Sequence, residues 1–161
     1  MPTQLHQLTQ SQERSDYDLT SLRVMVSGAA PLATTTKTSI MDCFPGVELH
    51  ELYGLTETGL ITNLRPEDQM RKTRCAGQAF LNMRFEIVDA EGHELPTGEV
   101  GEIIACGPTL FEGYYADEEA TACAYRDRYM HTGVSLGTLA ELESWQRRNR
   151  VGGLNIADGH R

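Results

Sequence analysis

Apolar and polar positions alternate along the stretch LRVMVSG, residues 22–28, and this period of two predicts a β-strand. Leu22, Val24 and Val26 share one face of that strand, and the residues between them share the other. The small residues of 28–31, Gly-Ala-Ala-Pro, then end it.

A four-residue spacing follows the strand. Within residues 32–44 an apolar side chain or a threonine recurs at every fourth position, which predicts a helix. The β-branched run 34–36 weakens its first half, and Pro45-Gly46 ends it. The next stretch, VELHELYG at 47–54, predicts a second strand. Strand, helix and strand in this order indicate the βαβ unit of a parallel sheet.

Beyond Arg65 the pattern changes to short alternating segments separated by turn residues. The polar stretch RPEDQMRKTRCAGQ, residues 65–78, predicts a loop. The elements expected after it are strands over 83–89 and 100–106, turns over 90–92 and 96–99, and a short helix over 117–125. Short strands with turns between them predict a small antiparallel sheet or barrel.

These patterns give an α/β fold class, in which a partial parallel βαβ sheet precedes a small antiparallel sheet or barrel subdomain. Residues 1–66, which begin with an expected helix and a polar connector, would form a partial α/β nucleotide-binding subdomain. Residues 67–133 would form the antiparallel subdomain. Residues 134–161 diverge in character, so we expect a poorly ordered tail and a truncated fold overall.

Composition narrows the classes of function. The chain of 161 residues has 14 basic and 23 acidic side chains, and its net charge of -9 disfavours nucleic acid and anionic membranes as partners. No apolar run approaches the ~20 residues of a membrane span. Residues 1–16 hold no signal-peptide core, so a cytoplasmic location is expected. The spacing of the four cysteines suggests no paired metal-ligand motif, and reduced structural thiols are expected.

The stretch HELYGLTETGLI, residues 50–61, holds the residues best suited to chemistry. Tyr53 offers a flat ring for a base, and Gly54 lets the backbone approach a ligand closely. Thr56 offers a hydroxyl donor to a phosphate oxygen. Glu57 would be repelled by phosphate unless a cation lay between them. It therefore implies a bridging Mg²⁺, which binds carboxylate and phosphate oxygens together.

Gly28, Ala29 and Ala30 follow the neighbouring predicted strand, and open α/β sheets bind ligands at the carboxyl ends of their parallel strands. These small residues would leave room for the other face of the base and expose carbonyls to its amino group. Two structural alternatives remain open. Tyr53 could be a half-buried strand aromatic, and the pair 56–57 could be the solvated start of a helix.

Five stretches within residues 1–133 carry a further signal, and they are YDLTSLR (17–23), SGAAPL (27–32), FPGVELHELYGLTETG (44–59), GEVGEIIACGPTLFEGYYADEEAT (98–121) and YMHTG (129–133). Together and in this collinear order they resemble one family, the adenylate-forming (AMP-dependent) ligase superfamily, and in particular its acyl-CoA synthetases.

The resemblance implies a reaction. The family activates a carboxylic acid with ATP, forming an acyl-adenylate and pyrophosphate, and a thiol, usually coenzyme A, then displaces AMP. By resemblance Tyr53 stacks on adenine, while Gly28 to Ala30 border the base and the acyl pocket. Thr56 contacts the phosphate and Glu57 holds Mg²⁺, and these two are the expected catalytic residues. The acid could be a fatty or an aryl acid, with fatty acids slightly favoured.

The chain also departs from the family pattern. The family's phosphate loop is not recognisable, and Val134 stands where the family's TGD aspartate would hold the ribose hydroxyls. The catalytic lysine of the carboxyl-terminal domain has no counterpart, because Lys37 and Lys72 lie outside the family motifs. The stretch GGLNI, residues 152–156, resembles a motif near the start of that domain or matches it by chance.

Two hypotheses follow from the motifs and the departures. The chain is a fragment of an AMP-forming acyl-CoA synthetase and is by itself inactive, or it is a non-catalytic remnant that at most binds adenine nucleotide weakly. A third class, a protein-interaction module without nucleotide, fits the collinear motifs less well. The oligomeric state cannot be inferred from the sequence.

Overall fold

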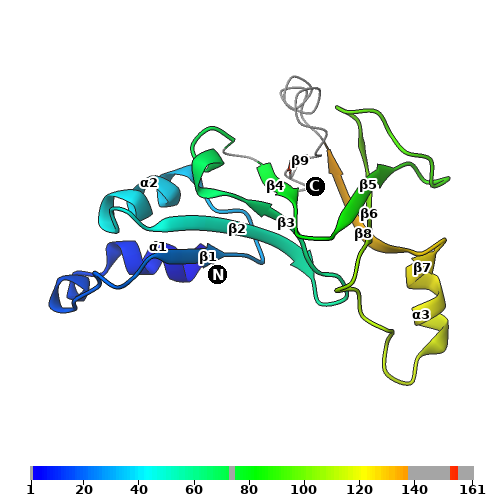
Figure 1. Cartoon of the computed structure of the whole chain (residues 1–161), viewed down its shortest axis with the longest axis horizontal. Coiled ribbons are helices and arrows are strands. Elements are labelled where there is room, and N and C mark those ends of the chain that lie inside the picture. The colour runs from blue at the N-terminus through cyan, green and yellow to red at the C-terminus, as the bar shows by residue number, and fades with distance from the viewer. Residues whose placement is uncertain (1, 73–74, 138–152, 156–161) are drawn as a thin grey trace.

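A bent mixed sheet organises the chain, which is described by a computed structural model over residues 2–72, 75–137 and 153–155 (Figure 1). Its strands are β1 (Val24–Ser27), β2 (Glu48–Leu55), β3 (Gly59–Leu64), β4 (Cys75–Ala79), β5 (Arg84–Val88), β6 (Val100–Cys106), β7 (Tyr125–Arg126), β8 (Tyr129–Gly137) and β9 (Gly153–Asn155). The described strands run in the order β1-β2-β3-β4-β9-β8-β6-β5, and β7 pairs with β8.

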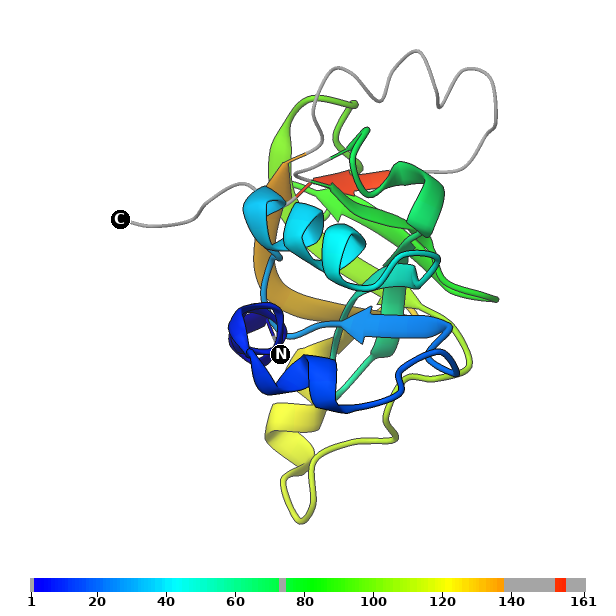
Figure 2. The same ribbon diagram turned by 90° about the vertical axis from the view of Figure 1, so that its left-hand side faces the viewer.

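Helices are few and short among the described residues. They are α1 (Pro2–Gln10), α2 (Thr34–Cys43) and α3 (Glu118–Ala124), together with the 3₁₀ turns η1 (Glu13–Asp16) and η2 (Pro66–Asp68). The first two lie next to each other at the β1 end of the molecule, and α3 lies at the opposite end (Figures 1 and 2). Within the described ranges, no helix is long and apolar enough to cross a membrane.

The predicted βαβ unit is confirmed by β1, α2 and β2. The two strands pair in parallel, with Met25 opposite Leu49. These two side chains are buried against Ile40 and Phe44 of the α2 region, and they form one apolar cluster. The helix begins at Thr34, two residues later than expected, because Ala33 at its N-cap is extended.

The predicted alternation along β1 is also confirmed, and the structure adds which face is covered. Met25 and Ser27 are buried, and Met25 packs in one cluster with Ile40 of α2. Val24 and Val26, on the other face, are 49% and 51% exposed. The strand β1 therefore carries one buried face and one apolar face that is about half exposed among the described residues.

One structural alternative and one local expectation were wrong. The pair 56–57 does not start a helix, because residues 56–58 form the turn of a hairpin between β2 and β3. The expected loop over 65–78 ends earlier, because β4 begins at Cys75. A Cβ on Gly77 would lie 2.1 Å from the backbone of Asn63 in β3, so the close pairing of these two strands requires a glycine at this position. Because glycine has a low strand propensity, the sequence did not predict a strand here.

The antiparallel part agrees with the sequence in its element types. β5 and β6 lie where strands were predicted, and β6 pairs with both β5 and β8. The short helix is α3, and the Asp117 carboxylate caps it by accepting a hydrogen bond from Ala120 N at 2.9 Å. Ile103 and Ala105 of β6 are fully buried and anchor two apolar clusters beneath this part of the sheet.

The division into residues 1–66, 67–133 and 134–161 stays a prediction. The described strands form one continuous sheet, and β8 runs through the expected boundary at 133/134. Within the expected tail, β9 pairs with β4 and β8. The remainder of the tail, 138–152 and 156–161, lies outside the described residues.

Candidate functional site

The turn between β2 and β3 presents the two predicted catalytic residues. Thr56 is exposed and Glu57 partly exposed, whereas Thr58 is completely buried. The Thr58 hydroxyl accepts a hydrogen bond from Leu55 N at 2.9 Å and donates one to Gly59 O at 3.0 Å. Thr58 therefore closes the turn from inside, which leaves the other two side chains accessible to a ligand.

A segment from the antiparallel part holds this turn from outside. Thr109 donates from its hydroxyl to Thr58 O at 2.7 Å. Phe111 N donates to Glu57 O at 2.7 Å, and the Tyr114 hydroxyl donates to Glu57 Oε1 at 3.0 Å. Sequence reasoning missed these three residues. The sequence feature that could have identified them is the run GPTLFEGY, residues 107–114, which lies inside the matched family stretch 98–121. No role was predicted for that run.

The structure gives a steric reason for a glycine at position 54, in addition to the expected close approach of a ligand. A Cβ at this position would lie 1.9 Å from Gly59 O and 3.0 Å from Leu60 Cα, at the bulge where β2 and β3 change register. The neighbouring strand therefore occupies the space that a side chain would need. A contact of Gly54 with a nucleotide stays a prediction.

The Gly28–Ala30 turn lies beside the same part of β2. Because Ser27 pairs in parallel with Glu51, the turn begins next to Leu52, and a Cβ on Gly28 would be 3.3 Å from Leu52 O. Ala29 has a φ of 72°, a left-handed conformation that is strained for a residue with a side chain. Backbone strain of this kind often marks a functional turn.

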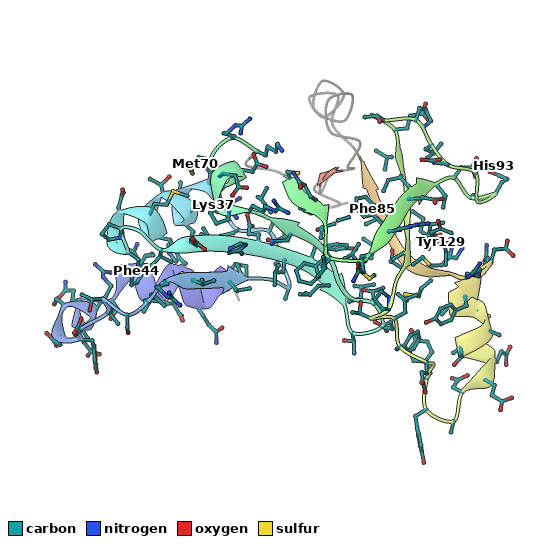
Figure 3. All side chains as sticks on the ribbon, in the orientation of Figure 1. Lys37, Phe44, Met70, Phe85, His93 and Tyr129 are labelled. Atoms are coloured by element: carbon teal, nitrogen blue, oxygen red, sulfur yellow. The ribbon has the colours of Figure 1, made fainter. Side chains whose placement is uncertain are left out.

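A buried ion pair ties the end of this turn to β2. Glu51 Oε2 accepts a hydrogen bond from Leu32 N at 2.9 Å, and Glu51 Oε1 pairs with Lys37 Nζ. The Lys37 side chain projects from α2 and is 1% exposed (Figure 3). Lys37 was not expected to replace a catalytic lysine, and the structure gives it this structural partner.

Tyr53 packs between two apolar clusters, one built on Ile103 and the other on Ala105. Its hydroxyl is buried, and no described atom meets hydrogen-bond geometry with it. Burial raises the pKa of the Tyr53 phenol, and the nearby Thr132 hydroxyl offsets this only in part. The half-buried strand aromatic is therefore supported, and stacking of the ring on adenine stays a prediction.

Val134, which stands where the family pattern has an aspartate, has an apolar packing role in this structure. Val134 lies against the apolar cluster of Ile103. Before it, Gly133 N donates to Glu102 Oε1 at 2.9 Å, and His131 Nδ1 lies 2.9 Å from Glu102 Oε2. Burial acts to raise the pKa of Glu102, but these two hydrogen bonds, together with the charges of His131 and Arg126, outweigh it and lower the pKa.

A metal ion would find one carboxylate in the turn. In the described part of the chain, no group of three or more His, Cys, Asp or Glu residues could hold a metal. The donor set of Glu57 with the nearby Thr56 hydroxyl fits a hard cation that takes its other ligands from phosphate and water, as Mg²⁺ does.

The model of the AMP-binding enzyme family matches residues 1–115. The chain belongs to the AMP-binding enzyme family. The resemblance to adenylate-forming ligases that the sequence indicated is thereby confirmed, and so is the predicted α/β fold class.

Other family members with similar sequences are ligases by name. 4-Coumarate–CoA ligase 1 of Glycine max is 35% identical over 134 residues, which cover 78% of this chain and 45% of that protein. A putative acyl–CoA ligase, YdaB of Bacillus subtilis (strain 168), is 33% identical over 80% of this chain and 25% of its own length.

Solved structures agree on the fold of this AMP-binding family member. The amide bond synthetase McbA of Marinactinospora thermotolerans superposes with a TM-score of 0.83 at 28% identity, over 98% of this chain and 30% of that one. The chain thus spans less than half the length of these relatives.

Proposed function

We propose that the chain carries part of the adenylate-forming site of an AMP-forming acid–thiol (acyl-CoA) ligase. In this reaction a carboxylate oxygen attacks the α-phosphorus of ATP and pyrophosphate leaves. The sulfur of coenzyme A then attacks the acyl carbonyl, and AMP leaves with the electron pair of the cleaved C–O bond. The substrates are ATP, coenzyme A and a carboxylic acid, and Mg²⁺ is the cofactor.

One observation carries the proposal. Two parallel strands place the strained Gly28–Ala30 turn beside Leu52 of β2, four positions before Thr56 in the turn that exposes Thr56 and Glu57. In the proposed complex Thr56 donates to a phosphate oxygen, and Glu57 supplies a carboxylate to the cation. Gly28 to Ala30 border the base, and the Tyr53 ring lies against it.

The names of the relatives support an aryl acid as the acyl substrate, because several of them are 4-coumarate–CoA ligases at 33–36% identity. This reverses the slight preference for fatty acids drawn from the sequence. Fatty acids are the alternative acid class, and a cytoplasmic location fits either.

A second candidate function is weak nucleotide binding without turnover, and the packing of Val134 favours it. An aspartate accepting ribose hydroxyls contributes about 1.5–3 kcal/mol, so a valine there lowers nucleotide affinity roughly ten- to a hundredfold. The substitution Val134→Asp should recover affinity for ATP, and Val134→Ala, which adds no acceptor, should not.

The deciding experiment measures ATP binding by calorimetry with Mg²⁺ present, and pyrophosphate release with coumarate and with fatty acids. We expect weak binding that Thr56→Ala diminishes, and no turnover by this chain alone. Turnover that Thr56→Ala abolishes would favour the full ligase over the second candidate. Absence of ATP binding in both the native chain and Val134→Asp would overturn both functions.

A further inference from the structure

Both the backbone and the side chain of Glu57 are held by one segment far away in sequence. The Tyr114 hydroxyl donates to Glu57 Oε1 across 57 positions of the chain, and Phe111 N donates to the Glu57 carbonyl. The Tyr114 ring stands edge-on to the Phe111 ring, with centroids 4.8 Å apart and planes at 74°. The donor hydroxyl therefore sits on a ring that packs against Phe111 on one side, while the Tyr114 side chain is 42% exposed.

The segment is in turn fixed by α3. Tyr114 N donates to Thr121 Oγ1 at 2.9 Å, and a Cβ on Gly113 would lie 2.7 Å from the same threonine. After α3, the Tyr125 ring stacks on Phe111 at 5.8 Å, and its hydroxyl donates to Phe111 O. These contacts set where the Tyr114 hydroxyl lies relative to the turn.

We propose that Tyr114 is a positioning residue for Glu57. Its hydroxyl occupies Oε1 and leaves Oε2 for the cation that is shared with the nucleotide phosphates. This inference rests on the proposed function, since it assigns Tyr114 to the cation ligand of that site.

The chemistry of a phenol suits this task better than that of a basic residue. A lysine or arginine at the same place would pair with the carboxylate and cancel the charge that attracts the cation. A neutral O–H donor restrains the carboxylate while its negative charge is kept. An otherwise mobile glutamate loses side-chain entropy when it binds a ligand, and restraint in advance removes part of that cost.

The first test uses the complete chain and measures ATP affinity by calorimetry, with and without Mg²⁺. Tyr114→Phe keeps the ring and removes the donor. We expect it to weaken Mg²⁺-dependent ATP binding roughly three- to tenfold, the effect of about one hydrogen bond, and to leave metal-free ATP binding unchanged. Tyr115→Phe is the matched control, because its neighbouring side chain is fully exposed, and it should behave as the native chain does.

The second test asks whether the effect of Tyr114 runs through Glu57. The same ATP-binding measurements are made on Glu57→Gln and on the double variant Glu57→Gln/Tyr114→Phe. Because the Tyr114 hydroxyl donates to Glu57 Oε1, removing it should weaken Mg²⁺-dependent binding less in the Glu57→Gln background than in the native chain.

The outcomes separate the two ideas. If Tyr114→Phe binds Mg²⁺-ATP as tightly as the native chain, the positioning role is wrong and the proposed function stands. If Tyr114→Phe weakens Mg²⁺-ATP binding as much in the Glu57→Gln background as in the native chain, its effect does not pass through Glu57 and the inference is wrong. If the native chain shows no Mg²⁺-dependent binding, the cation role of Glu57 falls, and the positioning role falls with it.

Discussion

Ala29 shows how a single residue can reveal the demands of a site. Its φ of 72° costs an L-amino acid about 1–2 kcal/mol, yet the turn keeps it between Gly28 and Ala30. The turn is therefore shaped by its attachment to β2, where Leu32 N donates to Glu51, rather than by the preference of its own residues. No sequence pattern indicated that the strain would fall on the middle residue.

This strain gives a simple stability prediction. Ala29→Gly removes it, so this variant should be at least as stable as the native chain in urea unfolding. Ala30→Gly, the neighbouring control, lacks that relief and should lose about 0.4–1 kcal/mol through unfolded-state entropy. Equal destabilisation by the two substitutions would contradict the strain.

Glu102 gives a pH prediction at the same scale. Because its folded-state pKa is lowered, its contribution to stability is present above the unfolded value near 4.5 and is lost as the pH falls through the folded value. The stability difference between the native chain and Glu102→Gln should therefore be largest near pH 6 and shrink below about pH 4. Glu99→Gln serves as the control carboxylate, and chemical denaturation at each pH provides the measurement.

Among the elements, strands with a period of two and helices with clear ends were predictable, whereas pairing-dependent strands were not. β6 was predicted with its observed bounds as a short strand that follows the turn at 96–99. β4 was missed because Ala76 and Gly77 carry no strand propensity, and what makes them a strand is their pairing with β3 and β9. The hydrogen bond from Tyr114 to Glu57 and the Lys37–Glu51 ion pair could not be predicted either, because each joins residues that are far apart in the sequence.

The junction of α2 with β2 carries the next prediction. Lys37→Met leaves the Glu51 carboxylate buried without its partner, and it should destabilise the chain by about 3 kcal/mol. The double variant Lys37→Met/Glu51→Gln should recover part of this loss, because glutamine can still accept the hydrogen bond from Leu32 N. Urea unfolding of the three proteins measures the effect, and an additive double variant would show that the pair is not coupled.

For the molecule as a whole, the open face of β1 is the feature with the largest practical consequence. Val24 and Val26 are both about half exposed on a strand that lies at one end of the described sheet. Apolar side chains on an edge strand favour association between copies.

We therefore expect concentration-dependent self-association in sedimentation experiments. Val24→Thr/Val26→Thr should reduce it, because threonine keeps the strand propensity and removes the apolar surface. Leu81→Thr, at a residue 77% exposed but outside the strands, is the control and should change little. A native chain that stays monomeric at all concentrations would contradict the expectation.

The bracing of the β2–β3 turn also has a consequence for synthesis on the ribosome. Residues 48–64, which form the hairpin, emerge well before Thr109, Phe111 and Tyr114, which hold its turn. A nascent chain stopped between them would display the threonine and the glutamate on an untethered loop. Because contacts between distant residues form late, the ordering of Glu57 would be among the last events of folding.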